Sequence, residues 1–219
     1  IMYIYIKCHK KEEKQKEKPA KPAAQSPKKA SVQAGRKPKH FKFGMEVELF
    51  TLDEKGYVTN GAERLIERVK KEFPEVDIKH EIGKHMIEIG VLPDTEVPDV
   101  MERTMSDFRS VLYAAEKEGL VLYPFGTYPG KFKPEARSDP RYNAMRKAIG
   151  LQRFHMTGRC IGLHCHYTLP WGVYDKKKQA LKKRVNSKHK QSMVDIYNLF
   201  IAIDPAITTF SQSSPFYQG

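Results

Sequence analysis

The chain has 219 residues, of which 40% are hydrophobic, so it is long enough and apolar enough to bury a core in one sizeable domain or two small ones. No apolar run approaches the roughly 20 residues that span a bilayer, and the short apolar opening lacks the small-residue cleavage site of a secretory signal, which predicts a soluble, cytoplasmic protein without a membrane partner. The net charge of +13 suggests nucleic-acid binding. Residues 1–40, however, hold 12 Lys and Arg against 3 Glu and so carry +9 of this charge. The remaining +4 belongs to residues 41–219, which are therefore only mildly basic.

Residues 1–40 are predicted to be a disordered basic tail. Between positions 7 and 39 they consist mainly of Lys, Glu, Pro, Ala, Gln and Ser, with almost no large apolar side chain to offset the entropy cost of ordering. We interpret the tail as a solubilising or linker segment, and electrostatic contact with an acidic partner is the alternative. The folded domain is therefore expected to span residues 41–219.

The domain is predicted to open with a strand, a helix and a hairpin. Residues 41–50 have strand composition, and the amphipathic helix that follows is expected to be capped by Asn60 and ended by Pro74. Alternating apolar and polar residues at 76–82 and 85–90 then predict two paired strands.

A second amphipathic helix is expected over residues 99–118, and Gly119 should end it. The apolar residues predicted to form its inner face are Val100, Met101, Met105, Phe108, Val111, Leu112 and Ala115. This face should pack on the sheet.

The second half of the domain repeats the alternation of strand and helix patterns. A short buried strand is expected over residues 120–126, a short helix over 140–149, and a strand over 160–169. Residues 176–199 read as a helix with a strongly basic first half, and residues 213–219 as a loop.

This order of elements predicts an α+β fold with a mainly antiparallel sheet covered by helices. A doubly wound parallel sheet is less favoured, because no glycine-rich turn of the nucleotide-binding type joins a strand to a helix.

Five polar residues lie inside apolar, strand-forming runs and are candidate metal ligands. Glu46 and Glu48 are two positions apart, so on a strand they share one face about 6.5 to 7 Å apart, and each could reach a different cation. Glu88 could bring a third carboxylate to that face, and His164 and His166 again share a face by the same rule. The alternative is an ordinary polar strand face with structural histidines.

Two neighbouring residues are weaker candidates. Glu81 precedes Glu88 by seven positions on the partner strand and could approach the same face. Cys165 lies between the two histidines, so on a strand it points to the opposite face, and we expect a buried core thiol rather than a metal ligand or nucleophile. With Cys8 and Cys160 it makes three widely spread cysteines, which form neither a disulfide framework nor a zinc–thiolate cage.

Three acids with one or two histidines are more typical of Mg²⁺ or Mn²⁺ holding phosphate than of structural zinc. A pair of such cations would neutralise nucleotide phosphates and position a phosphoryl group for transfer. The Gly-x-x-x-x-Gly-Lys-Ser/Thr loop is absent from the sequence, which excludes a P-loop enzyme.

The chain resembles the N-terminal half of the glutamate–cysteine ligase type 2, or carboxylate–amine ligase, family, whose fold is related to glutamine synthetase. The similar stretches occur in the family's order over residues 41–219. They are Gly-Met-Glu-Val-Glu (44–48), Met-Ile-Glu-Ile (86–89), Gly-Thr-Tyr-Pro (126–129), Arg-Tyr (141–142), Gly-Leu-His-Cys-His (162–166) and Ser-Ser-Pro-Phe-Tyr-Gln-Gly (213–219).

The resemblance implies a role for each candidate. Glu46 and Glu48 would each bind one of two or more Mg²⁺ ions that bridge ATP, and Glu88 would join a metal or the amino-acid site. His164 would bind the metal nearest the transferred phosphate, and His166 would contact the nucleotide phosphates. The implied reaction is the ATP-dependent joining of an amino-acid carboxylate, such as glutamate, to an amine, such as cysteine, through an acyl phosphate, as in glutathione biosynthesis.

The family's chains continue well past the 213–219 stretch, so we expect an incomplete catalytic domain: a fragment of a longer ligase, or a reduced form that something else completes. Two other hypotheses stay open. One is a non-catalytic remnant that keeps the fold; the other is nucleic-acid binding through the tail and the basic residues at 176–190, for which the sequence offers no known recognition module. The expected partners are small-molecule substrates, and the sequence is compatible with a homo-oligomer.

Overall fold

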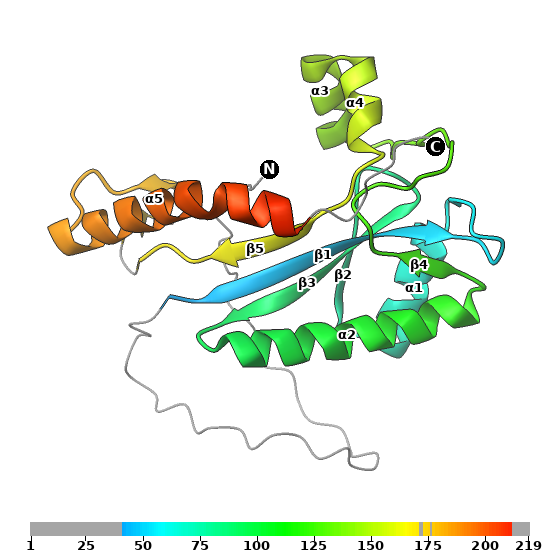
Figure 1. Cartoon of the computed structure of the whole chain (residues 1–219), viewed down its shortest axis with the longest axis horizontal. Coiled ribbons are helices and arrows are strands. Elements are labelled where there is room, and N and C mark those ends of the chain that lie inside the picture. Colours follow the sequence, from blue (N-terminus) through cyan, green and yellow to red (C-terminus); the bar gives the residue numbers. More distant parts are fainter. Residues whose placement is uncertain (1–40, 171–172, 176, 212–219) are drawn as a thin grey trace, which may run out of the picture.

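In the computed structural model, residues 41–170, 173–175 and 177–211 are described. The predicted tail at 1–40 and the predicted loop at 213–219 lie outside these residues. The described part has an α+β fold in which helices cover one face of an antiparallel sheet (Figure 1).

The sheet is built around one long strand. β1 (Phe43–Leu52) pairs along one edge with β3 (Met86–Asp94), and β3 pairs in turn with β2 (Asp77–His80). The other edge of β1 is shared, because β5 (Leu163–Tyr167) pairs with its first half and β4 (Val121–Tyr123) with its end. All four pairings are antiparallel, as predicted, and the hairpin of β2 and β3 is confirmed.

Two helices cover one face of this sheet, α1 (Ala62–Glu72) and α2 (Val97–Lys117) (Figure 1). Residues alternate in direction along a strand, so the odd-numbered apolar residues of β1 and β3 turn to the helices. The buried cluster that joins strands and helices contains Leu49, Ala62, Leu65, Ile66, Val69, Val76, Ile78, Ile87, Ile89, Val111, Ala114, Ala115 and Leu120. The even-numbered residues of β1 are left to the opposite face, which carries the functional candidates.

The ends of the two helices bear out one prediction and correct another. Gly61, not Asn60, is the N-cap of α1, and no side chain caps the helix. The backbone N–H of Ala62 donates to the carbonyl of Lys84 at 3.2 Å, so the neighbouring hairpin supplies the acceptor that a capping side chain would offer. Gly119 ends α2 as predicted, with a φ of +63° that favours glycine.

The predicted inner face of α2 is wrong at three positions. Met101, Met105 and Leu112 are exposed by 40% or more, whereas Thr104 and Ala114 are buried. The helix contacts the sheet along a narrower stripe than its apolar residues suggest. A threonine fits there because its hydroxyl donates to the carbonyl four residues earlier, at 2.7 Å. The predicted residues that are buried or packed on the core are Val100, Phe108, Val111 and Ala115.

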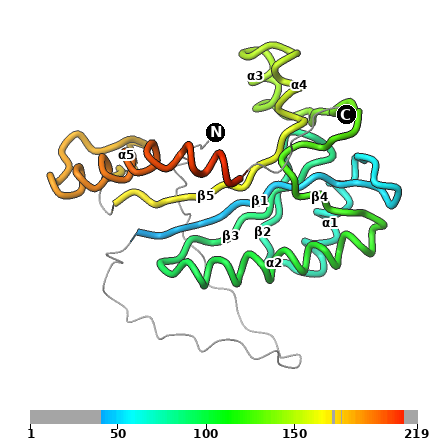
Figure 2. The backbone as a smooth tube through the Cα atoms, in the orientation of Figure 1, coloured from blue at the N-terminus to red at the C-terminus, as the bar shows by residue number. Residues whose placement is uncertain are grey.

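A helical pair lies at the end of the sheet, α3 (Pro140–Ile149) and α4 (Leu151–Thr157) (Figure 2). The sequence predicted α3 and missed α4, which follows after Gly150 alone and is only seven residues long. A second buried cluster joins the pair to the sheet and contains Phe50, Leu52, Ile82, Met86, Tyr142, Phe154 and Ile161. His85 adds a buried contact, with its Nε2 2.8 Å from the carbonyl of Gly158.

The predicted strands of the second half are shorter and more exposed than expected. β4 covers three of the seven residues predicted at 120–126, and Val121 is 48% exposed. β5 covers five of the ten predicted at 160–169, and Cys165 on it is exposed rather than buried. The cysteine does point away from the two histidines, as predicted, but α1 and α2 lie over β1, β2 and β3 and leave that face of β5 uncovered (Figure 1).

The helix predicted over residues 176–199 begins later. Residues Tyr174–Asp175 and Ala180–Leu181 form a small hairpin, β6 and β7, and the helix α5 runs over Ser187–Phe210, capped by the side chain of Asn186. The hairpin and its connection to α5 therefore contain the described basic residues of this stretch, which are Lys177, Lys178, Lys182, Lys183 and Arg184.

α5 has no buried residue, and the ring of its Phe200 lies 6.3 Å from the ring of Tyr167 on β5. By length and composition it could cross a membrane, a criterion that core helices of soluble proteins also meet. This differs from the expectation from the sequence, in which no apolar run approaches the length of a bilayer span.

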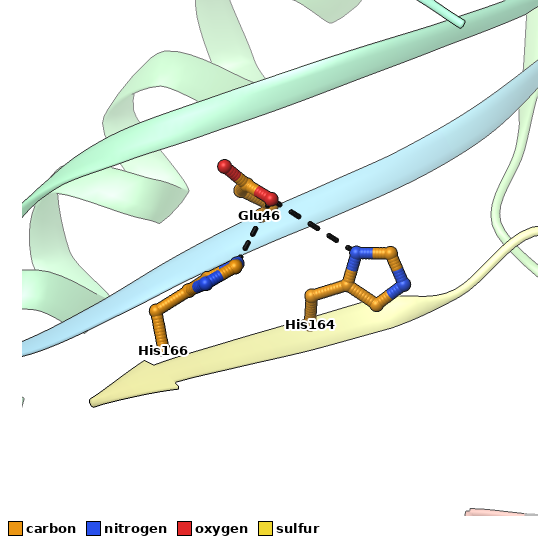
Figure 3. Close-up of side chains that lie close together, drawn as sticks. All are labelled: Glu46, His164 and His166. Atoms are coloured by element: carbon orange, nitrogen blue, oxygen red, sulfur yellow. Dashed lines mark ion pairs between the residues drawn. The ribbon is translucent and has the colours of Figure 1, made fainter. Parts of the chain in front are cut away.

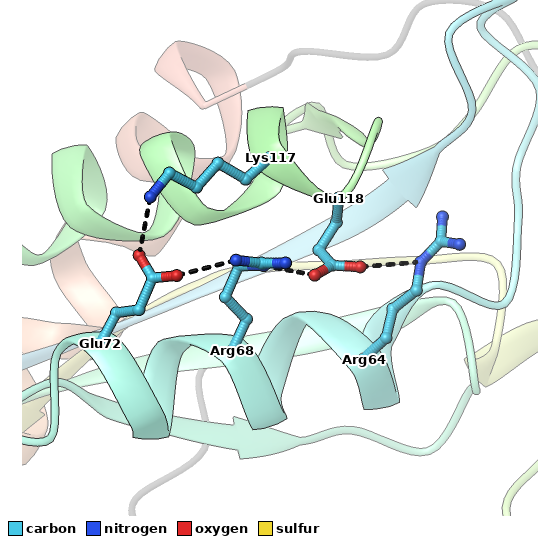
Figure 4. A network of polar contacts seen from close by, with 5 residues as sticks. All are labelled: Arg64, Arg68, Glu72, Lys117 and Glu118. Atoms are coloured by element: carbon cyan, nitrogen blue, oxygen red, sulfur yellow. Dashed lines mark hydrogen bonds and ion pairs between the residues drawn. The ribbon is translucent and has the colours of Figure 1, made fainter.

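An ion-pair network joins α1 to the end of α2 (Figure 4). Arg68 contacts both Glu118 and Glu72, the latter at 2.8 Å, and Lys117 also reaches Glu72 at 3.2 Å. Arg64 lies 3.9 Å from Glu118. Glu118 is 18% exposed and meets two cations from the other helix, so it is the network's main link.

Replacing Glu118 by Gln should lower the thermal midpoint by about 1 to 4 °C in low salt, because it removes the charge that two arginines of α1 share. The difference should shrink in 0.5 M NaCl, since screening weakens partly exposed pairs. Glu116→Gln, an exposed position on the same helix, is the matched control and should change little. Equal shifts for both variants, or a salt-independent difference, would contradict this role.

Candidate functional site

Three strands bring all five candidate residues to the sheet face opposite α1 and α2. In the strand register, Glu48 pairs with Glu88, and Glu46 pairs with His164. His166 pairs with Gly44, one side-chain step further along the same face. All five side chains are partly buried, with between 11% and 27% of each side chain exposed.

Glu46, His164 and His166 form the first group, in which ligand atoms lie within 4.8 Å of one another (Figure 3). The Nε2 atom of His166 is 2.8 Å from Oε2 of Glu46, and Nδ1 of His164 is 4.0 Å from the same oxygen. His166 Nε2 is buried and has no partner in hydrogen-bond geometry. A buried imidazole nitrogen that lies beside a carboxylate oxygen without a hydrogen bond to it fits a metal ligand.

His164 also faces the second carboxylate of β1. Its Nδ1 lies 3.7 Å from Oε1 of Glu48, slightly closer than to Glu46. Gly162 makes room for this ring, because a Cβ at that position would meet Nε2 of His164 at 2.8 Å. The N–H of Gly162 also donates to Oε2 of Glu48 at 2.8 Å, which orients that carboxylate.

Glu48, Glu81 and Glu88 form the second group, again with ligand atoms within 4.8 Å of one another. Glu81, which the sequence analysis ranked as a weaker candidate, comes directly after β2. The signal was in the hairpin: Lys79 pairs with Glu88, so Glu81, two residues on, returns to the same face. The backbone N–H of Ile82 donates to Glu81 at 3.0 Å and holds it there.

The second group concentrates negative charge in a partly buried place. The pKa of Glu48 is raised to about 7, mainly by burial and in smaller part by the charges of Glu88 and Glu46, against the lowering effect of the Gly162 hydrogen bond. The pKa of Glu81 is likewise raised to about 7, mainly by burial and in smaller part by repulsion from Glu48 and Glu88. Like charges directly opposed across strands destabilise a sheet, so packing alone does not account for this arrangement.

One cation of the protein already lies beside the group. Lys79 Nζ is 3.2 Å from Oε1 of Glu88 and 3.0 Å from Oδ2 of Asp77. It offsets part of the negative charge on Glu88.

The two donor sets differ in chemistry. Three carboxylates suit a hard cation such as Mg²⁺, whose oxygen ligands lie about 2.0 to 2.1 Å away, and ligand atoms within 4.8 Å of one another can close around one ion with little movement. One carboxylate with two imidazoles also admits Mn²⁺ or another transition metal. The residues therefore fit two cations on one face, with His164 between them.

Comparison with known proteins identifies the family of the chain. Residues 42–219 match the family described as Glutamate-cysteine ligase family 2 (GCS2). The chain belongs to this family. The resemblance seen in the sequence is thereby confirmed, and the α+β fold is that of a glutamine synthetase-like family.

Curated relatives of this GCS2 chain carry the name "Putative glutamate–cysteine ligase 2". The protein of Chromobacterium violaceum is 26% identical over 179 residues, and that of Laribacter hongkongensis is 29% identical over 182 residues. Each match covers 80% of this chain and 42% of the relative. A relative from Janthinobacterium sp. (strain Marseille) is 26% identical, with 43% of its length covered. The chain thus spans about two fifths of the length of the curated relatives it matches.

Proposed function

We propose that the chain is part of an ATP- and Mg²⁺-dependent carboxylate–amine ligase of the glutamate–cysteine ligase type. Membership of the GCS2 family supports a ligase. Dependence on ATP and Mg²⁺ is proposed from the two three-residue ligand groups on one sheet face. Two adjacent cations bound there would be suited to holding the phosphates of a nucleotide.

In this proposal Glu48, Glu81 and Glu88 hold one Mg²⁺, and Glu46 and His164 hold a second cation. His166 completes the second set, a role that its 2.8 Å approach to Glu46 favours over the phosphate contact inferred from the resemblance alone. When bound, the cations would neutralise the phosphates of ATP and the charge that develops during transfer. Lys79 and the N–H of Gly162 fix the orientation of Glu88 and Glu48 before substrates arrive.

The reaction would proceed in two steps. An oxygen of the substrate carboxylate attacks the γ-phosphorus of ATP, the bond to the β–γ bridging oxygen breaks, and an acyl phosphate and ADP result. The nitrogen of the amine then attacks the acyl carbon, the C–O bond to phosphate breaks, and an amide, inorganic phosphate and a proton are released. Glutamate and cysteine are the proposed acid and amine.

The test is phosphate release from ATP by the longest protein that the natural gene encodes, measured beside the 219-residue chain. We expect release to require Mg²⁺ or Mn²⁺ together with glutamate and cysteine, with an amide as the second product. Glu48→Gln should reduce the rate at least about 100-fold, while Glu67→Gln, an exposed residue of α1, should not. If the longest protein neither binds ATP with Mg²⁺ nor releases phosphate with any acid and amine pair, the chain is a non-catalytic member of its family.

A further inference from the structure

A second polar site lies at the edge of the sheet, outside the two ligand groups. A cavity of about 680 Å³ opens between the start of α1, the edge strand β2 and the start of α3. Its lining contains none of the residues of the carboxylate–histidine face. The lining residues are Asn60, Glu63, His80, Lys84, Arg137, Ser138, Asp139, Arg141 and Tyr142. Sites that hold metabolite-sized ligands have volumes of about 300 to 1,000 Å³.

The cavity gathers three permanently charged cations from three separate segments. Lys84 comes from the turn between β2 and β3, Arg137 from the segment before α3, and Arg141 from the first turn of α3. Lys84 is itself paired with Glu135, whose Oε2 lies 3.1 Å from its Nζ. Two acids also line the cavity, and both are engaged within the protein. Glu63 lies 2.6 Å from Arg137 and 3.5 Å from His80, and the Asp139 side chain accepts from the backbone N–H of Arg141 at 2.7 Å.

Arg137 is the least satisfied of these groups. Its side chain is only 16% exposed, and its Nη1 donates to Glu63. Its Nε and Nη2 atoms are buried and have no hydrogen-bond partner, and Nδ1 of His80 is in the same state. Buried polar groups are nearly always hydrogen-bonded, so unpaired nitrogens from two side chains in one cavity indicate a ligand that bonds to them. The Nε and Nη2 edge of a guanidinium matches the two oxygens of a carboxylate or phosphate.

We propose that this cavity binds a small organic oxyanion, a metabolite that carries a carboxylate or a phosphate. The shared chemistry is a planar or tetrahedral group of negatively charged oxygens, held by Arg137 and Arg141 with Lys84 at the rim. The site is independent of the proposed ligase activity, since it needs neither the divalent cations nor the carboxylate–histidine face.

The experiment uses the 219-residue chain in EDTA, without ATP or divalent cations. Its result therefore does not depend on whether the protein is a ligase. Inorganic phosphate and, separately, glutarate are titrated at constant ionic strength while the histidine ring signals are followed by NMR. The His80 signal is identified by its loss in His80→Gln. We expect a saturable shift of His80 with at least one probe, and little change at His164 and His166.

Arg141→Gln and Lys84→Gln should each weaken the binding at least about tenfold, since each removes a charge-assisted contact. Arg146→Gln, an exposed arginine on the same helix outside the cavity, is the matched control and should leave it unchanged. A response to phosphate alone or to glutarate alone supports the site and identifies the type of oxyanion. No saturation with either probe, a shift at His164 and His166 in place of His80, or equal effects of Arg141→Gln and Arg146→Gln overturns the proposal.

Discussion

Glu48→Gln should remove one of two divalent-cation sites and leave the other. The wild-type chain is expected to bind two Mn²⁺ ions, because two separate three-residue groups lie on the same face. Glu48 belongs to the all-carboxylate group, so its neutral amide should weaken that site at least about tenfold, the loss that removing even an outer-shell partner often causes. Electron paramagnetic resonance of free Mn²⁺ at pH 7.5 measures the stoichiometry directly.

The complementary variant is Glu46→Gln. It should remove the site formed with His164 and His166 and leave the all-carboxylate site, so each variant binds one ion and the double variant none. Glu67→Gln on the surface of α1 should still bind two. If Glu48→Gln and Glu46→Gln both lose all binding, the two groups act as a single site. If neither variant loses an ion, the face does not bind cations.

The strand pattern of the sequence was enough to predict which candidate residues share a face within one strand. Glu46 with Glu48, and His164 with His166, were expected to share a face because strand residues alternate, and the structure places them so. The sequence could not show that β5 pairs with the first half of β1. That pairing connects residues more than a hundred positions apart, and it is what places His164 opposite Glu46.

Errors in the predicted fold have a common physical origin, namely that local composition does not reveal what covers a surface. Cys165 was expected in a core, but the helices stop short of β5 and it is exposed. Met101 on α2 follows the helical period, yet its side chain is exposed. Thr104 is buried against the sheet instead, which is possible because its hydroxyl donates to a backbone carbonyl. Glu81 was predicted only as a weaker candidate for a different reason, because the position of its carboxylate depends on the register of β2 and β3.

The pH dependence of stability provides a further test of the acidic group, and its sign is opposite to that of most carboxylates. Between pH 4.5 and about 7 the folded chain keeps protons on Glu48 and Glu81 that the unfolded chain has already lost. The free energy of unfolding should therefore fall as pH rises through this range, by on the order of 1 to 3 kcal/mol, and level off above pH 7. His85 acts in the other direction: burial lowers its pKa, so its contribution to stability is lost as pH falls below 6.5.

In EDTA at pH 8, Glu48→Gln should consequently be more stable than the wild type, because the amide removes a buried charge that repels Glu88 and Glu46. With saturating Mn²⁺ the order should reverse, since the bound cation stabilises only a chain that can hold it. Urea unfolding at pH 5, 6.5 and 8, with EDTA or with Mn²⁺, measures both effects, and Glu67→Gln should follow the wild type throughout. A Glu48→Gln variant that is less stable than the wild type in EDTA at pH 8 would show that this carboxylate serves packing rather than cation binding.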